Sequence, residues 1–167
     1  MQDVERKPRL ARLLPGGNLA GSLYGTVLVT SVLVAFTDSE RPGLIIAGVL
    51  VTTVVFAIAH AWARALAGSG AERKPFDRHA LRHAVGHEWA IVEAALPASV
   101  VLLLAVFDVY SVETGLWVAV LLNVGLLFAW GIGLRQLSGG TGLQALGAGL
   151  ASATLGLVLV LLKILVH

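Results

Sequence analysis

The sequence predicts an all-α, polytopic membrane protein in which five transmembrane helices form a bundle. Hydrophobic residues make up 57% of the chain and charged residues only 13%, whereas a soluble domain usually has roughly 25% charged residues. Five apolar segments are each about 20 residues or longer, which suffices for a helix to cross roughly 30 Å of hydrocarbon. A backbone in lipid must satisfy its own hydrogen bonds, and these runs are continuous rather than alternating, so we expect helices.

These segments divide the chain into a tail and one domain. Residues 1–18 are polar and basic, and we expect them to form a cytoplasmic tail. Residues 19–167 are expected to form a single transmembrane domain with a basic cytoplasmic connection at 68–87. The first apolar run resembles a signal peptide, but it is long and no small-residue cleavage site follows it, so we expect it to be retained. The predicted spans are 19–37, 43–67, 88–108, 112–134 and 142–166.

The lysines and arginines predict the orientation. Ten of the twelve fall on the side that holds the tail, the 68–87 connection and Arg135, whereas Arg41 and Lys163 fall on the other side. The positive-inside rule therefore predicts a multi-pass protein of the inner (cell) membrane with its N-terminus in the cytoplasm. Because these basic residues flank apolar segments, we expect a lipid bilayer, and no nucleic acid, as their partner.

Small residues recur at four-residue spacing in four of the predicted helices, which lets helices approach closely in a membrane. These stripes suit packing within the chain, and they also suit a homo-oligomer interface. The stripes are Gly21 and Gly25; Ala57, Ala61 and Ala65; Gly125, Ala129 and Gly133; and Ala148, Ser152 and Gly156.

Two ionisable residues within the apolar segments, His60 and Glu93, are the strongest functional signal. Titratable groups inside a membrane are costly and usually face a bundle interior, a partner or a cavity. Both residues are expected one to two turns from the cytoplasmic ends of consecutive helices, so they could meet. A carboxylate beside an imidazole can stabilise the imidazolium or relay protons. The same contact could also be only an ion pair that clamps two helices.

Five more polar residues complete the candidate proton or ion site. Arg64 follows His60 by four residues and shares its helical face. Asn123 needs a partner if it is buried, although such an amide is also a common interhelical bond. Pro97 removes a backbone hydrogen bond and is expected to kink the third helix near Glu93. The five are Arg64, His87, Glu88, Tyr24 and Asn123.

A metal site is a weaker hypothesis. His79, His83 and His87 recur every four residues, the spacing that two zinc ligands on a helix need. The segment is basic, however, and a helix lying on anionic headgroups explains the pattern as well. We therefore predict no cofactor, with a divalent metal as the minor alternative. No nucleophile elbow, metalloprotease motif or cofactor fingerprint supports an enzyme.

Several short motifs resemble those of a family of small, uncharacterised integral membrane proteins from bacteria with high-GC genomes. The similarity covers most of the chain. It implies a polytopic architecture, and it implies no mechanism because no activity is assigned to that family. The motifs are Leu23-Tyr24-Gly25-Thr26, Phe56 with Ala59-His60 and Trp62-Ala63, His87-Glu88-Trp89 with Val92-Glu93, and Gly156 with Leu162-Lys163.

The leading functional hypothesis is a proton- or ion-handling protein of the transporter or channel type. The alternative is a structural or accessory membrane subunit, in which the His–Glu contact only clamps helices and the 68–87 segment docks a partner or anionic lipid. A metal-binding membrane protein is the third hypothesis. The residues do not indicate which ion is handled or in which direction.

Overall fold

The computed structural model describes residues 18–36, 41–72 and 78–166. These residues form helices and no strands, which confirms the all-α prediction for the described part of the chain. The helices are α1 (Leu19–Ala35), α2 (Pro42–Glu72), α3 (Arg78–Glu93), α4 (Leu96–Val106), α5 (Val112–Leu137) and α6 (Gly142–Val166).

Three of these helices are long and apolar enough to cross a membrane, and a fourth span results if α3 and α4 count as one bent span. The three are the segments Pro42–Ala67, Val112–Leu137 and Gly142–Leu165. The predicted first span corresponds to α1, which has 17 residues and is therefore only about 25 Å long. The described helices thus support a multi-pass membrane protein, while the number five stays a prediction.

The third predicted span, at 88–108, is two helices rather than one. α3 ends at Glu93 and α4 begins at Leu96, with a bend of 41° between them. Pro97, in the first turn of α4, has no N–H to donate to the carbonyl of Glu93, so the helical ladder is interrupted there. The chain tightens at the break, because the Ala95 N–H donates to the Val92 carbonyl at 3.0 Å. The predicted kink at Pro97 is therefore confirmed.

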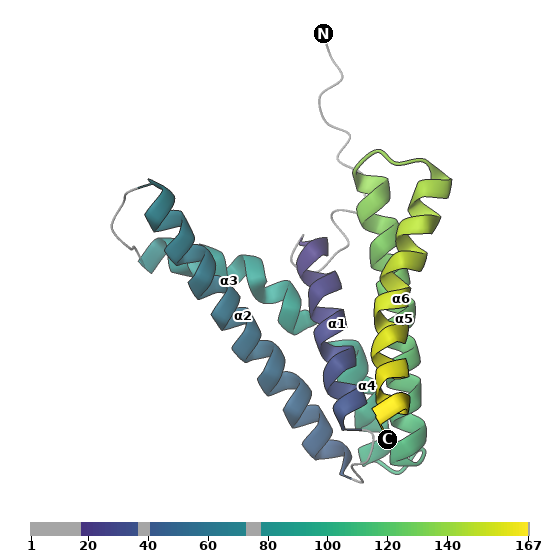
Figure 1. Cartoon of the computed structure of the whole chain (residues 1–167). Helices are drawn as coiled ribbons and strands as arrows, with labels where there is room; N and C mark the ends of the chain where they lie inside the picture. Colours follow the sequence, from purple (N-terminus) through teal and green to yellow (C-terminus); the bar gives the residue numbers. More distant parts are fainter. Residues whose placement is uncertain (1–17, 37–40, 73–77, 167) are drawn as a thin grey trace.

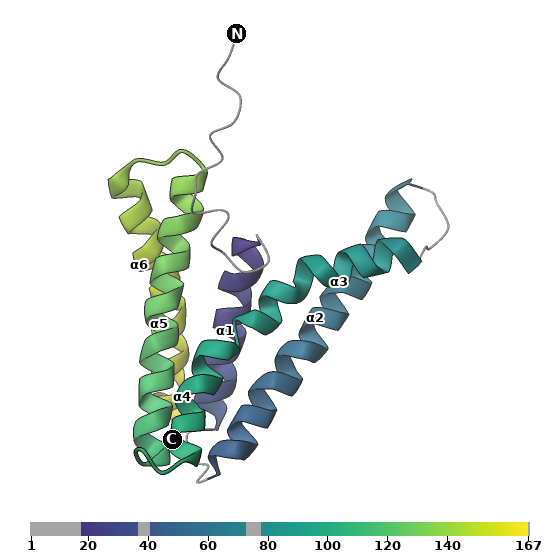
Figure 2. The same ribbon diagram turned by 180° about the vertical axis from the view of Figure 1, so that it is seen from behind.

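α1 lies between two helix pairs (Figure 1). The antiparallel hairpin of α5 and α6 lies on one side of it, and α2 slants away on the other. Seen from behind, α3 runs obliquely from α2 to α1 and continues into α4 (Figure 2). The apolar core joins the helices at the end of the molecule where α2 begins and α4 ends. It is made of Val29, Leu33, Ile45, Val49, Ala95, Ala98, Leu102, Leu116, Ala119 and Val120.

The small-residue stripes differ in what they contact. A Cβ on Gly25 would lie 2.8 Å from the Ile91 carbonyl oxygen of α3, and a Cβ on Gly131 would lie 2.5 Å from the Ala148 carbonyl oxygen of α6. Helix backbones therefore touch at these glycines. By contrast, a Cβ on Gly43, Gly125 or Gly142 would meet no described atom within 4 Å.

On α2 the predicted stripe of Ala57, Ala61 and Ala65 is buried. On α5 the predicted stripe is turned outward at Gly125 and Ala129, and the close contact falls on Gly131 instead. Spacing alone predicted which residues share a face of α5, but not which face meets α6.

Candidate functional site

An ion pair with a buried carboxylate joins α2 and α3. The Arg64 guanidinium lies 2.6 Å from Glu88 Oε1, and Glu88 exposes only 2% of its surface. A carboxylate this deeply buried needs a cationic or hydrogen-bonding partner. Arg64 supplies this partner while about half of its side chain stays exposed. The sequence pointed to both residues, but not to their pairing.

Asn18 ties the beginning of α1 to the same place. Its Oδ1 accepts the Gly21 N–H at 2.9 Å and so caps α1, while its Nδ2 donates to the His87 carbonyl at 3.1 Å. Nδ2 also lies 3.1 Å from His87 Nδ1, a contact that is a hydrogen bond when that ring nitrogen carries no proton. His87 Nδ1 is in turn 3.5 Å from Glu88 Oε1.

Asn18, Arg64, His87 and Glu88 form one polar cluster that joins α1, α2 and α3. Sequence reasoning missed Asn18, although an asparagine directly before an apolar helix is a recognisable N-cap signal.

His60 lies about one turn deeper on α2, on the side that faces α1. Its ring centre is 5.0 Å from that of Tyr24 on α1, and its Nδ1 is 3.2 Å from the Phe56 carbonyl oxygen. Two of the predicted site residues, His60 and Tyr24, are therefore in contact. The contact of Nδ1 with its own helix gives His60 a structural role, and among the described residues its other ring nitrogen forms no hydrogen bond.

Glu93 does not meet His60. In the described part of the chain, His60 and Glu93 form no ion pair within 4.0 Å. The Arg64–Glu88 register puts the two at the same level, but five residues of α-helix turn Glu93 by about 140° away from Glu88. It therefore lies on the same side of α3 as the exposed residue Trp89, and not on the side of Glu88.

The Glu93 carboxylate has a buried oxygen with no partner among the described residues. Its Oε2 is buried and accepts no hydrogen bond from any described group. Glu93 is also the last residue of α3, directly before the break. Glu93 thus has an ionisable side chain, ends a helix, and has a backbone carbonyl that receives no hydrogen bond from Pro97.

Asn123 lies apart from these groups, on α5. It is fully buried, its Nδ2 donates to the Ala119 carbonyl at 2.8 Å, and its Oδ1 has no described hydrogen-bond partner. The bond that joins α1 and α5 is a different one, from Trp130 Nε1 to Thr26 Oγ1 at 3.2 Å.

The described residues contain no group of three or more potential metal ligands. The side chains of His79 and His83 lie outside the described part of the structure, so the predicted metal site on that face stays a prediction.

Comparison of the chain with family models, with curated proteins and with solved structures finds no match. The features of the molecule that bear on its function are two polar regions, the polar cluster and the Glu93 carboxylate.

Proposed function

We propose that this chain is a multi-pass membrane protein that handles protons or small cations, and that Glu93 is the group that takes them up. The observation that carries this proposal is the buried carboxylate oxygen of Glu93, which lies in an apolar segment and has no partner among the described residues. Arg64 forms its ion pair with Glu88, not with Glu93.

The position of Glu93 suits an exchangeable cation. The last carbonyls of a helix carry partial negative charge, so a carboxylate at the end of α3 adds to it and attracts a proton or a metal cation. Broken helices in transport proteins expose carbonyl groups that coordinate ions in the same way. At this break Pro97 leaves the carbonyl of Glu93 without its helical donor.

Cationic groups at one end of the molecule support an N-terminus in the cytoplasm. The polar cluster holds Arg64 at this end, together with Asn18 at the start of α1. Leu19 lies within 3.9 Å of a Cβ on Gly133, which brings Arg135 to the same end. Three parts of the chain thus contribute to one polar, partly basic end, the distribution expected on the cytoplasmic side.

Reconstituted protein tests the proposal. Wild-type protein in proteoliposomes should dissipate an imposed proton, Na⁺ or K⁺ gradient faster than empty liposomes do. Glu93→Gln, which keeps the shape and removes the charge, should lower the rate to that of empty liposomes. Glu113→Gln is the matched control, since Glu113 is an exposed carboxylate in the first turn of α5. Equal rates for Glu93→Gln and wild type would contradict the role of Glu93, and no flux with any of the three gradients would contradict the function.

An accessory subunit is the second candidate, and the buried Arg64–Glu88 pair is the observation that favours it. Such a pair fixes the relative position of α2 and α3 without any transport. In that case Glu88→Gln and Glu93→Gln should both leave the liposome permeability at the level of empty liposomes and change only the stability of the protein.

A further inference from the structure

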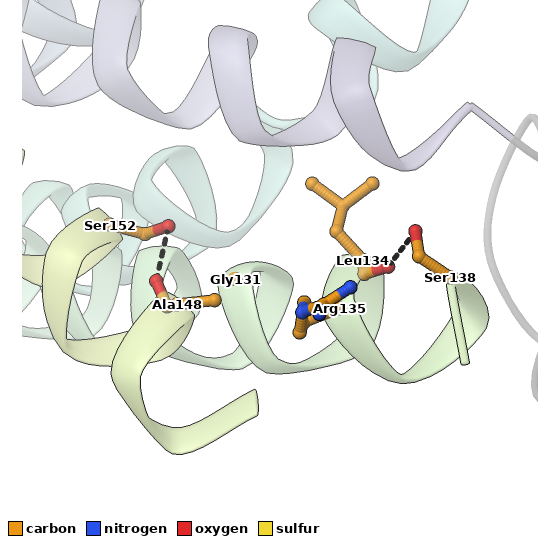
Figure 3. A pocket seen from close by; sticks show the side chains of 6 residues that line it. All are labelled: Gly131, Leu134, Arg135, Ser138, Ala148 and Ser152. Carbon is orange, nitrogen blue, oxygen red and sulfur yellow. Dashed lines mark hydrogen bonds between the residues drawn. The ribbon is translucent and has the colours of Figure 1, made fainter. Parts of the chain in front are cut away.

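A groove of about 220 Å³ lies between α5 and α6 near the turn that joins them (Figure 3). The two helices approach closely at this point. A Cβ on Gly131 would lie 2.5 Å from both the Ala148 carbonyl oxygen and Ser152 Oγ, so only glycine allows this approach. The groove is lined by Gly131, Leu134, Arg135, Ser138, Ala148 and Ser152.

The turn between the helices holds Arg135 in place. The Gly139 N–H donates to the Gln136 carbonyl and the Gly140 N–H to the Arg135 carbonyl, each at 3.0 Å, which is the Schellman pattern of a helix end. Gly139 has a φ of +75°, the left-handed conformation that this pattern requires. A Cβ on Gly140 would lie 2.7 Å from Arg135 Cγ and 2.8 Å from Arg135 Nε. A side chain at 140 would therefore displace the Arg135 side chain, which lies across the turn.

The charge of Arg135 has no counter-charge in the described structure. Its Nη2 donates to Gln144 Oε1 at 2.6 Å, and Gln144 is neutral. No described carboxylate lies within 4.0 Å of the guanidinium. The hydroxyls of Ser138 and Ser152 donate to the carbonyls of their own helices at 3.0 and 2.9 Å. The remaining N–H groups of Arg135 are therefore the donors that this groove offers to a ligand.

We infer that this groove binds the headgroup of an anionic phospholipid, with the phosphate on Arg135. A guanidinium forms two parallel hydrogen bonds with a phosphate. The Leu134 and Ala148 walls suit the glycerol and the first acyl carbons. α5 and α6 are both candidate spans, so the groove at their shared end lies at headgroup depth. The inference requires a membrane location, and it does not depend on the role of Glu93.

Native mass spectrometry of the full chain tests this site. Protein in detergent is incubated with phosphatidylglycerol or with phosphatidylcholine of the same acyl chains. We expect wild type to retain one phosphatidylglycerol preferentially. One basic contact with an anionic lipid corresponds to about a fivefold change in affinity, so Arg135→Gln should weaken retention by about that factor. Arg135→Lys should weaken it less, since the charge stays.

Two further variants separate position from charge. Gly140→Ala keeps every charge but displaces the Arg135 side chain, so it should also weaken retention. Arg41→Gln removes one charge just before α2, at the opposite end, and should leave retention unchanged. Circular dichroism identifies any variant that does not fold.

Equal retention by wild type and a folded Arg135→Gln would overturn the inference. It would also be overturned if soluble glycerol phosphate displaced the lipid at equal concentration, because the site would then bind free phosphate rather than a lipid.

Discussion

The α5–α6 hairpin and the α2–α3 pair pack in different ways. In the hairpin, two unbroken helices approach each other at glycines, whereas in the other pair α3 ends at Glu93, before the break. In the hairpin, glycines contact the opposite helix at Gly131, Gly149 and Gly156, and Arg135 lies at the end that carries the turn. In the α2–α3 pair, the Ala57, Ala61 and Ala65 side chains of α2 are buried, and an ion pair joins Arg64 to the buried Glu88 carboxylate of α3. The α5–α6 hairpin is therefore held by close backbone contact, and the α2–α3 pair by charge.

The largest effect is expected where the charge is buried. Arg64→Met should lower the free energy of unfolding by about 3 kcal/mol, because it leaves the buried Glu88 carboxylate unpaired. Glu88→Gln should cost less, since the Arg64 left behind is half exposed and can be hydrated. Denaturation of both variants in detergent micelles measures the difference. Equal losses would mean that the pair behaves as an exposed one.

The hairpin should respond to volume rather than to charge. Gly131→Ala places a methyl group against the Ala148 backbone, and we expect a loss of about 2 kcal/mol. Gly125→Ala on the same helix has open space around it and should stabilise the protein by up to about 1 kcal/mol through helix propensity. Thermal unfolding of the two variants gives the sign of each effect. A loss at both positions would place a neighbour against Gly125.

Asn18 caps the beginning of α1 and bonds to α3, and we expect it to contribute moderately to the free energy of unfolding. Asn18→Ala removes the bond to the Gly21 N–H and should cost about 1 kcal/mol. Asn18→Asp keeps that cap but loses the amide donor to His87, so it should recover part of the loss. If Asn18→Asp is as unstable as Asn18→Ala, the bond to His87 is the more important one.

The smallest effect is expected at the bond between α1 and α5. Trp130→Phe removes the hydrogen bond to Thr26 and keeps most of the apolar surface, so it should cost about 0.6 kcal/mol. Thr26→Val removes the same bond, and the double variant should then lose little more than either single variant. Additive losses in this cycle would show that the two side chains act independently.

The sequence predicts the properties that belong to one helix at a time. The helical class and the kink at Pro97 follow from propensity and spacing, and the structure confirms them for the described residues. The Ala57 stripe suits packing within the chain or an interface between copies, and the structure buries it within the chain. α1 ends at Ala35, close to the predicted boundary at 37, since apolar composition locates the end of a helix only to within a few residues.

What the sequence could not predict is the rotation of one helix against another. His60 and Glu93 are at one level, yet they lie on different sides of the α2–α3 contact. Glu88 is the carboxylate that faces α2, and its partner is Arg64. The turn of about 140° between Glu88 and Glu93 decides this, and it matters only once α3 has docked. On α5, the rotation of the helix against α6 likewise decides that Gly131 contacts α6 and that Gly125 does not.

The open space at two glycines, Gly43 and Gly142, makes them suitable positions for chemical labelling. The chain contains no cysteine, so a single introduced thiol is the only one that a maleimide can modify. Gly43 and Gly142 begin α2 and α6 at opposite ends of the molecule, and neither substitution meets a described neighbour within 4 Å (Figure 1). If the N-terminus is cytoplasmic, a membrane-impermeant maleimide should label Gly43→Cys in intact cells and reach Gly142→Cys only after lysis. The reverse labelling pattern would place the N-terminus outside the cell. Glu93 would then be reached from the opposite side of the membrane.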